Sequence, residues 1–276
     1  MKTYKLGFIG CGNMGRAMLE GAVNTKWCAA EKICLSTKSA ETREAIAAKN
    51  GVIALENNRE VAKNSDIIVL AVKPNIYKSV LEDIREVLED GQILLAIAPA
   101  YSTDAVAAVV GKSGVRVARA MPNTPAQIGQ GMSGLCFSDN MDGSERALVT
   151  SFFESFGKVA VVREDVMHAV GSVSGSSPAF VYMFIEAMAQ GAIKLGIPAK
   201  NAILFAAQST LGAASLVLET GEHPAVLRDN VCSAGGTTIE GVATLEAQGF
   251  KGAIIEAMDK TSQKFLQMEE NAKKAL

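Results

Sequence analysis

A glycine pattern near the start of the chain is the first group of residues whose spacing indicates chemistry. Gly10, Gly12 and Gly15 match the G-x-G-x-x-G pattern, between a short apolar run and a helical stretch. In such a turn the first glycine permits the bend, the second lets a pyrophosphate approach the backbone, and the third lets helix and strand pack closely. An ordinary glycine-rich turn is the alternative. The predicted cofactor-binding residues of this segment are Gly10, Gly12, Asn13, Met14 and Gly15.

The end of the next expected strand indicates which dinucleotide binds. In NAD-binding domains an Asp or Glu about twenty residues after the glycines holds the ribose 2′-hydroxyl. Here the chain reads Ser36, Thr37 and Lys38, with Arg43 one turn further on. Hydroxyl groups and cations bind a 2′-phosphate through charge-assisted hydrogen bonds, whereas a carboxylate repels it. We therefore predict NADPH as the preferred cofactor, with NADH as the second option; the alternative is an ordinary solvated surface at Lys38 and Arg43.

A later glycine turn has the residues to hold a carboxylate. Gly235 and Gly236 come directly before Thr237 and Thr238 at the expected start of a helix, where free amides and hydroxyl groups meet positive potential. The Thr238 hydroxyl could also donate a hydrogen bond to a ligand atom whose charge changes. Taken alone, a helix start of this kind is more often a capped turn between two helices than a binding site.

Length, charge and cysteine content restrict the class of protein. The chain has 276 residues, 49% of them hydrophobic, which is enough for two domains. Its 27 Lys and Arg nearly balance 29 Asp and Glu, so a small molecule is a better expected partner than nucleic acid or a membrane. The five cysteines form no C-x-x-C pair, which favours core residues in a reducing cytoplasm and no metal site. We expect no export signal.

The first part of the chain alternates strand and helix patterns. Strands are expected at residues 5–9, 32–36, 66–72, 92–97, 116–119 and 159–162. Helices are expected between them at residues 14–24, 40–50, 76–89 and 103–110. This alternation predicts an α/β domain of the Rossmann type over residues 1–162, a doubly wound parallel sheet with βαβ connections throughout.

The rest of the chain, residues 163–276, is expected to be an all-helical domain for substrate binding and dimerisation. Helices are expected over residues 177–195 and 198–220, after residue 224, from a cap near Thr237 or Thr238, and from about residue 252. Ser177 would cap the first of them ahead of Pro178. The stretch 202–218 is apolar on several faces and needs cover. We expect a homodimer through these helices rather than a membrane span; burial inside one chain is the alternative.

Four segments carry a family resemblance. They are residues 71–74, 119–125, 174–179 and 223–238. With them the chain resembles the Δ1-pyrroline-5-carboxylate reductases over nearly its full length. The most specific part is the block from Ser233 to Thr238, which reads S-x-G-G-x-T and is followed by Gly241, Leu245 and Glu246.

The resemblance implies reduction of a five-membered cyclic imine acid to proline, the last step of proline synthesis, by hydride transfer from the nicotinamide. It also implies an active site formed between the two domains and across a dimer. Ala71, Val72, Lys73 and Pro74 would lie along the nicotinamide end of the cofactor, and Asn58 beside the adenosine. The implied substrate-binding residues are Asn230, Ser233, Gly235, Gly236, Thr237 and Thr238, with Thr238 as the catalytic residue.

The absence of a general acid also favours imine reduction. A dehydrogenase of ketones or hydroxyacids needs a His or Lys that exchanges a proton with the substrate oxygen. His168 and His223 have no partner at a useful spacing. The related β-hydroxyacid dehydrogenases carry a catalytic lysine after a glycine cluster, where this chain has no lysine before Lys194. An iminium is already protonated and electrophilic, so hydride positioning carries most of the catalysis.

Two residues depart from the family pattern. Pro99 stands where the family has an Ala-Gly turn and restricts a loop near the nicotinamide, and Ser177 stands where glycine is common. We therefore predict an NADPH-preferring pyrroline-5-carboxylate reductase of the cytoplasm, as a homodimer or a larger assembly of dimers. The alternatives are another cyclic-imine or β-hydroxyacid-type oxidoreductase on the same fold, and a non-catalytic NADP-binding protein.

Overall fold

The computed structural model describes residues 2–275 and divides the chain into two compact units. Unit 1 consists of Met1–Ser176 together with Thr261–Leu276, and unit 2 consists of Ser177–Lys260. The strands among the described residues all belong to unit 1, whereas unit 2 is helical. The predicted class, an α/β Rossmann sheet followed by helices, is confirmed.

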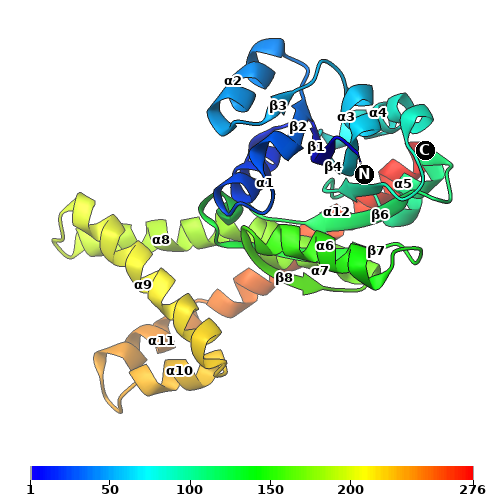
Figure 1. Ribbon diagram of the computed structural model, residues 1–276. Helices are drawn as coiled ribbons and strands as arrows, with labels where there is room; N and C mark the ends of the chain where they lie inside the picture. Colours follow the sequence, from blue (N-terminus) through cyan, green and yellow to red (C-terminus); the bar gives the residue numbers. More distant parts are fainter. Residues whose placement is uncertain (1, 276) are drawn as a thin grey trace. The chain divides into compact units, whose positions relative to one another are not determined.

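Unit 1 is built on one eight-stranded sheet in the order β3-β2-β1-β4-β5-β6-β7-β8 (Figure 1). Most strands read as continuous buried runs because helices cover both faces of the sheet. The six expected strands are present, and β3 and β7 are additional. The strands are β1 (Tyr4–Ile9), β2 (Ile33–Ser36), β3 (Ile53–Ala54), β4 (Ser65–Leu70), β5 (Ile93–Ala96), β6 (Arg116–Met121), β7 (Gly131–Phe137) and β8 (Gly157–Val161).

The expectation of βαβ connections throughout is wrong at one place. β7 pairs antiparallel with β6, with Ala120 opposite Leu135, and β8 then pairs parallel with β7. An antiparallel neighbour needs no crossover helix, so the chain turns back through a short 3-10 helix at Thr124–Ile128. β7 contains Gly131 and Gly134, which weaken the strand signal in its sequence.

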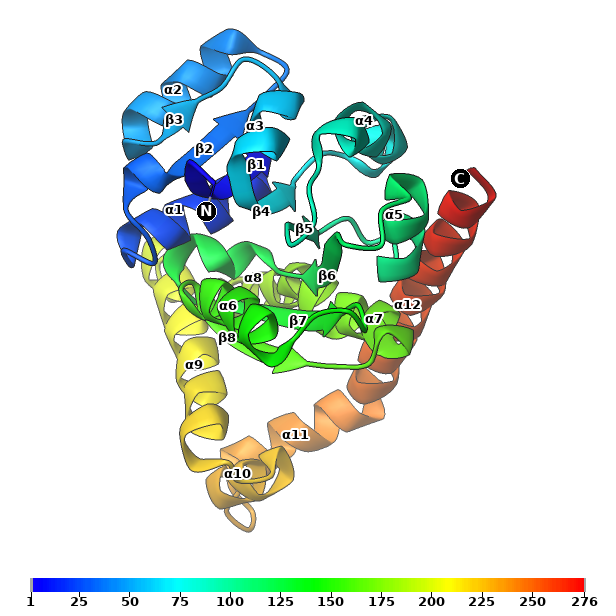
Figure 2. The same ribbon diagram turned by 45° about the vertical axis from the view of Figure 1, so that its right-hand side comes forward.

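Two hydrophobic cores lie on the two faces of the sheet. One contains residues of α1, α2 and α6, and the other contains residues of α3, α4 and α5, with Met268 and Ala272 of α12 packed against it. Figure 2 shows the end of α12 running beside α5. These helices are α1 (Asn13–Asn24), α2 (Ala40–Asn50), α3 (Asn58–Asn64), α4 (Tyr77–Ile84), α5 (Thr103–Val110), α6 (Gly143–Glu154) and α12 (Phe250–Ala275).

The sheet order places a switch point between β1 and β4. Ile9, the last residue of β1, is opposite Ser36 of β2 on one side and Leu70 of β4 on the other. The chain connects in opposite directions from these two neighbours, so the segments that follow β1 and β4 diverge and leave a crevice at the carboxyl ends of the strands.

Unit 1 ends in a helical turn of unusual type. α7 (Met167–Val170) passes into a π-helix, η6 (Gly171–Ser176), which leads directly into α8 (Ser177–Lys194) of unit 2. The expected N-cap at Ser177 is therefore wrong, because helical turns precede this residue. Isolated π-turns within helices are frequent at functional sites.

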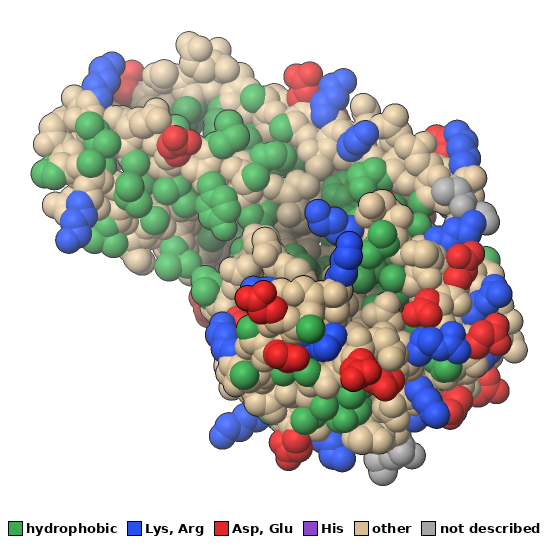
Figure 3. All heavy atoms as spheres, turned by 90° about the horizontal axis from the view of Figure 1, so that it is seen from above, with side chains coloured by type: hydrophobic (Ala, Val, Ile, Leu, Met, Phe, Trp, Pro, Cys, Tyr) green, Lys and Arg blue, Asp and Glu red, His purple; other side chains and the backbone are tan. Residues whose placement is uncertain are grey.

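Unit 2 has a very small core of its own. α8 packs on α9 (Ala199–Thr220) through Ala189, Ala202 and Ala206. α10 (Pro224–Val231) and α11 (Thr237–Ala247) follow, and α12 begins in this unit. Hydrophobic side chains gather on its surface in Figure 3. Large exposed examples are Tyr182, Met183, Leu195, Ile203, Leu204, Phe205, Leu218 and Ile255.

Candidate active site

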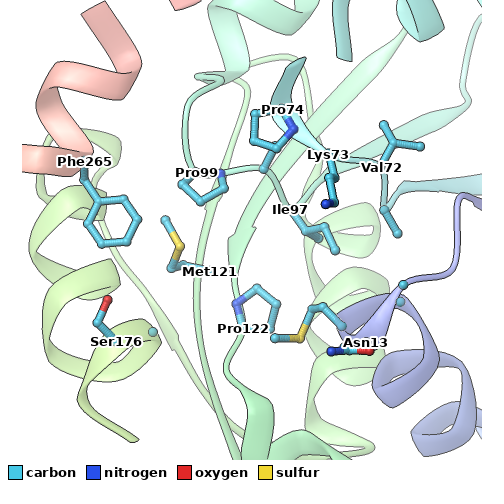
Figure 4. Close-up of a pocket in the computed structure, with 16 residues that line it drawn as sticks. Asn13, Val72, Lys73, Pro74, Ile97, Pro99, Met121, Pro122, Ser176 and Phe265 are labelled. Atoms are coloured by element: carbon cyan, nitrogen blue, oxygen red, sulfur yellow. The ribbon is translucent and has the colours of Figure 1, made fainter. Parts of the chain in front are cut away.

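A cavity of about 530 Å³ lies at the switch point of unit 1 (Figure 4). The glycine turn after β1, the loop after β4, the loop after β5, the end of β6, the π-helix and α12 all contribute to it. The wall is mainly apolar, and Lys73 is its one charged lining residue. The residues that line this cavity are Gly12, Asn13, Met14, Gly15, Ala71, Val72, Lys73, Pro74, Ile97, Ala98, Pro99, Met121, Pro122, Gly175, Ser176 and Phe265.

The glycine turn has the geometry that each glycine position requires. Gly10 has φ +78°, and a Cβ there would lie 2.9 Å from the Ala71 carbonyl oxygen. A Cβ on Gly15 would lie 3.0 Å from the Ala71 Cβ, so this glycine lets α1 pack against the strand end. A Cβ on Gly12 would meet nothing within 4 Å. The backbone at Gly12 is therefore open to a ligand from the cavity side.

The N-terminus of α1 is suited to hold an anion. Gly12 is the N-cap residue, no side chain caps the helix, and the first turn carries no acidic residue. The first amides of a helix lack partners within it and carry its positive potential, which favours a phosphate. The residues present fit a pyrophosphate at this place.

The expected adenosine-side residues meet beside the same turn. The Gly10 N–H donates to the Ser36 carbonyl at 2.9 Å, and the Ser36 hydroxyl donates to the Asn58 Oδ1 at 2.8 Å. The Thr37 hydroxyl donates to the Ser39 carbonyl at 2.7 Å, and the Lys38 side chain is exposed. No carboxylate ends β2, whose last residue is Ser36. Because no carboxylate repels an anion here and the Lys38 cation is exposed, this strand end suits a 2′-phosphate, although both hydroxyl protons are donated within the protein.

The loop after β4 is held firmly where it borders the cavity. The Ala71 N–H donates to the Ile9 carbonyl at 2.9 Å, and Pro74 begins a 3-10 helix at Pro74–Ile76 with Lys73 as its N-cap. The buried ring of Tyr77 stacks on Tyr101 at 4.5 Å. Burial raises the pKa of both tyrosines, so their hydroxyl groups stay protonated and their role is packing.

The thiol of the cysteine inside the glycine turn is buried and held in its protonated form. Cys11 is buried, and this burial raises the pKa of its thiol to about 12. Nor do residues 2–275 contain a group of three His, Cys, Asp or Glu side chains arranged to hold a metal ion. Both histidines have structural partners: His168 Nδ1 lies 2.7 Å from the Ser262 hydroxyl, and His223 Nδ1 accepts from the Ala225 N–H.

The expected substrate-binding residues lie together in unit 2. Gly235 has φ +68°, and Gly236 is the N-cap of α11 with no side-chain cap. The Gly236 N–H donates to the Ser233 carbonyl, and a Cβ on Gly236 would lie 2.3 Å from the Ser233 hydroxyl oxygen. Thr237 and Thr238 are therefore in the first turn of α11 rather than at its cap, and both are exposed, as is Asn230 at the end of α10.

Comparison with known proteins decides the family. Residues 164–268 match the family model described as pyrroline-5-carboxylate reductase dimerisation, and residues 5–100 match the one described as NADP oxidoreductase, coenzyme F420-dependent. The pyrroline-5-carboxylate reductase of Escherichia coli is 44% identical over 94% of this chain and 96% of its own length. The chain belongs to the pyrroline-5-carboxylate reductase family. That of Arabidopsis thaliana is 34% identical over 93% of this chain and 92% of its own length.

Solved structures agree with this assignment. The Coxiella burnetii pyrroline-5-carboxylate reductase is similar with a TM-score of 0.90 and 32% identity, covering 96% of this chain and 98% of the other. The Plasmodium falciparum pyrroline carboxylate reductase, solved with NADP bound, has a TM-score of 0.88 and 29% identity, covering 98% of this chain and 99% of the other.

Several residues of the cavity are not among the site residues that the sequence predicts. Ile97 and Ala98 follow β5, Met121 ends β6 and Pro122 follows it. The rule that ligands bind at the carboxyl ends of parallel strands could therefore have found them. Phe265 carried no such signal, because it reaches this pyrroline-5-carboxylate reductase cavity from a helix near the end of the chain.

Replacing Lys38 with methionine is expected to raise the KM for NADPH about tenfold, since a hydrogen bond to a charged group contributes about 1.5–3 kcal/mol. The KM for NADH should stay unchanged, because NADH has no 2′-phosphate. Steady-state kinetics with both cofactors measures the ratio. Lys49→Met is the matched control, since Lys49 is an exposed lysine of α2 that pairs with Glu20. Equal changes in the KM for NADPH and the KM for NADH would show that Lys38 does not bind the 2′-phosphate.

Proposed function

We propose that this chain reduces 1-pyrroline-5-carboxylate to L-proline with NADPH. NADPH supplies a hydride to the imine carbon, and the electron pair of the C=N bond moves to the nitrogen, which keeps the proton of the iminium. The similarity to a pyrroline-5-carboxylate reductase over 94% of the chain carries the proposal. The switch-point cavity supports it, because its glycine turn and uncapped helix fit a dinucleotide.

The residues of unit 1 hold and orient the cofactor in this proposal. The amides after Gly12 bind the pyrophosphate, while Ser36, Thr37, Lys38 and Asn58 hold the adenosine end with its 2′-phosphate. Ala71, Val72, Lys73 and Pro74 line the nicotinamide end of the cavity. The apolar wall excludes water from the reacting carbon.

The turn between α10 and α11 holds the substrate in this proposal. The amides of Thr237 and Thr238, in the uncapped first turn of α11, bind the substrate carboxylate at the positive end of this helix. Asn230, Ser233 and Gly235 shape the turn, and the Thr238 hydroxyl donates to the lone pair that hydride transfer creates on the nitrogen. The iminium needs no further general acid, so orientation of the two reactants supplies most of the rate.

The helical part of the chain forms a homodimer. An apolar groove of about 690 Å³ lies between α8, α11 and α12, with Phe184, Met188 and Ile254 in its wall. α9 is long and apolar enough to cross a membrane, and 11% of its most apolar stretch is buried. Residues 164–268 match a dimerisation family, which supports a second copy of this chain as the partner that covers these apolar surfaces.

We propose the finer assembly as well. In this proposal residues 1–162 supply most of the cofactor site, and residues 163–276 supply substrate binding and dimerisation. Gly175, Ser176 and Phe265 of the second part also line the cofactor cavity of unit 1. The active site is completed across the dimer. The dimers associate further, and the enzyme works in the cytoplasm, where the free cysteines stay reduced.

NADPH oxidation, followed by its near-ultraviolet absorbance, tests this function. The substrates are 1-pyrroline-5-carboxylate, piperideine carboxylate and pyruvate in parallel. Turnover on the five-membered imine alone is the expected result. Preference for the six-membered ring would assign the chain to another imine reductase, with Pro99 as the first suspected specificity element. Oxidation of NADPH with pyruvate would favour a hydroxyacid dehydrogenase. No oxidation of NADPH with any of the three substrates would favour a non-catalytic NADP-binding protein.

A further inference from the structure

One buried arginine lies behind the wall of the cavity. Arg119 on β6 has a side chain that is 1% exposed. Its Nη2 donates to the Pro99 carbonyl at 2.7 Å and to Glu269 of α12, and its Nη1 lies 3.3 Å from Glu164 Oε1. A buried guanidinium needs such partners, since an unpaired buried charge is strongly destabilising. Arg119 therefore joins three segments that are far apart in the sequence.

The carboxylates extend this network in two directions. Glu164 also accepts hydrogen bonds from the Thr103 N–H at 2.7 Å and from the Thr103 hydroxyl at 2.6 Å, at the start of α5. The loop after β5, residues 97–102, is thus held at Pro99 by Arg119 and at its far end by Glu164 through Thr103. Pro99 has no N–H of its own, so its carbonyl is the polar backbone group that can fix it.

Two of the segments that Arg119 joins, and its own strand β6, carry part of the cavity wall. Pro99 lines the cavity directly, and Met121 follows Arg119 by two residues on the same strand. Phe265 precedes Glu269 by four residues, so both lie on one face of α12. Met121 and Phe265 pack in one small cluster with Met167. Figure 4 shows Pro99, Met121 and Phe265 together on one side of the cavity.

We propose that Arg119 is a positioning residue for hydride transfer, which holds Pro99 and Phe265 against the nicotinamide end of the cavity. This rests on the proposed function of that cavity. Ser36 and Asn58, at the adenosine end, take part in none of the hydrogen bonds of Arg119, Glu164 and Glu269 described above. Loss of Arg119 should therefore loosen the nicotinamide while leaving overall cofactor affinity in place. A displacement of about 1 Å at the reacting atoms can lower the rate about a hundredfold.

The test replaces Arg119 with methionine and compares it with Arg116→Met. Arg116 is on the same strand and pairs with Glu145 at 3.1 Å, and it does not line the cavity. For Arg119→Met we expect kcat with 1-pyrroline-5-carboxylate to fall about a hundredfold while the Kd for NADPH stays unchanged. The kinetic isotope effect with deuterated NADPH should rise, because hydride transfer becomes rate-limiting. Arg116→Met should match the wild type in all three.

A second variant covers a failure to fold. Arg119→Met leaves Glu269 without its buried partner, so the double variant Arg119→Met/Glu269→Met replaces the pair by apolar groups, which proteins often tolerate. It still lacks the donor to the Pro99 carbonyl, so its kcat should stay as low as that of the single variant. Arg119→Lys keeps one donor and should recover part of the rate. Wild-type kcat in the folded double variant would overturn the proposal, as would equal losses of kcat and NADPH affinity.

A measurement without substrate separates this proposal from the proposed function. The fluorescence anisotropy of bound NADPH reports the mobility of the nicotinamide. It should fall in Arg119→Met and the double variant at saturating NADPH and stay at the wild-type value in Arg116→Met. If the wild type does not turn over the imine but the anisotropy still falls in the two Arg119 variants only, the proposed reaction fails and the positioning role stands. An unchanged anisotropy overturns the positioning role whatever the wild-type activity is.

Discussion

Replacing Gly12 with valine is expected to lower NADPH affinity at least about a hundredfold without unfolding the protein, because the backbone amides that approach a phosphate contribute about 1.5–3 kcal/mol each. Gly12 has φ −72° and ψ −165°, which any residue adopts. A Cβ there meets nothing within 4 Å, so the new side chain enters open space on the cavity side. That space is where the pyrophosphate must approach the backbone. Isothermal titration with NADPH gives the affinity, and thermal unfolding of the apo protein gives the stability.

Gly10→Ala is the matched control for this prediction. Gly10 has φ +78°, and a Cβ there lies 2.6 Å from Val72 Cγ1 and 2.9 Å from the Ala71 carbonyl oxygen. Such a backbone conformation costs a non-glycine residue about 1–3 kcal/mol, so this variant should unfold at a lower temperature than the wild type. Full NADPH affinity in Gly12→Val would show that the pyrophosphate lies elsewhere, and a lowered unfolding temperature would show that Gly12 is structural.

The sequence predicted the part of the fold that depends on local pattern. The alternation of β-rich runs and helical stretches is visible in any short window, as is the glycine turn after β1, so the sheet and the cofactor end of the site could both be predicted. α6 was missed although Asp142 and Glu145 form a capping box at its start, a signal that the sequence carried. β7 was missed because its two glycines weaken the strand pattern in the sequence, and because its register is set by pairing with β6.

The rest of the candidate site depends on contacts between distant residues. Phe265 and Ser176 reach the cavity from helices whose apolar pattern indicates only that one face is buried. Arg119 bonds to Glu269, 150 residues further along the chain, and no spacing rule connects the two. Glu164 and Thr103 are likewise 61 residues apart. Such pairs form only when the whole chain folds. A local sequence pattern can therefore indicate that a residue is buried or polar, but not which distant residue it contacts.

Replacing Thr238 with alanine is expected to lower kcat about a hundredfold, because removing one hydrogen-bond donor at a site of changing charge costs that factor or more. NADPH affinity should stay unchanged, since the proposed cofactor site is in unit 1 and Thr238 is in unit 2. The fold should also persist, because Thr238 is exposed and Gly236 rather than a threonine caps α11. Steady-state kinetics and NADPH titration of the same preparation measure both quantities.

Two further variants decide whether the Thr238 hydroxyl is responsible. Thr238→Ser keeps the hydroxyl and should recover most of the rate, whereas Thr238→Val keeps the shape and should be as slow as alanine. Thr244→Ala is the matched control, because Thr244 is an exposed threonine of the same helix whose hydroxyl donates to the Glu240 carbonyl. If alanine at position 238 weakens NADPH binding and turnover equally, Thr238 supports the structure of the site instead of donating to the substrate nitrogen. If valine is as fast as serine, the hydroxyl has no part in the reaction and the imine is reduced by hydride positioning alone.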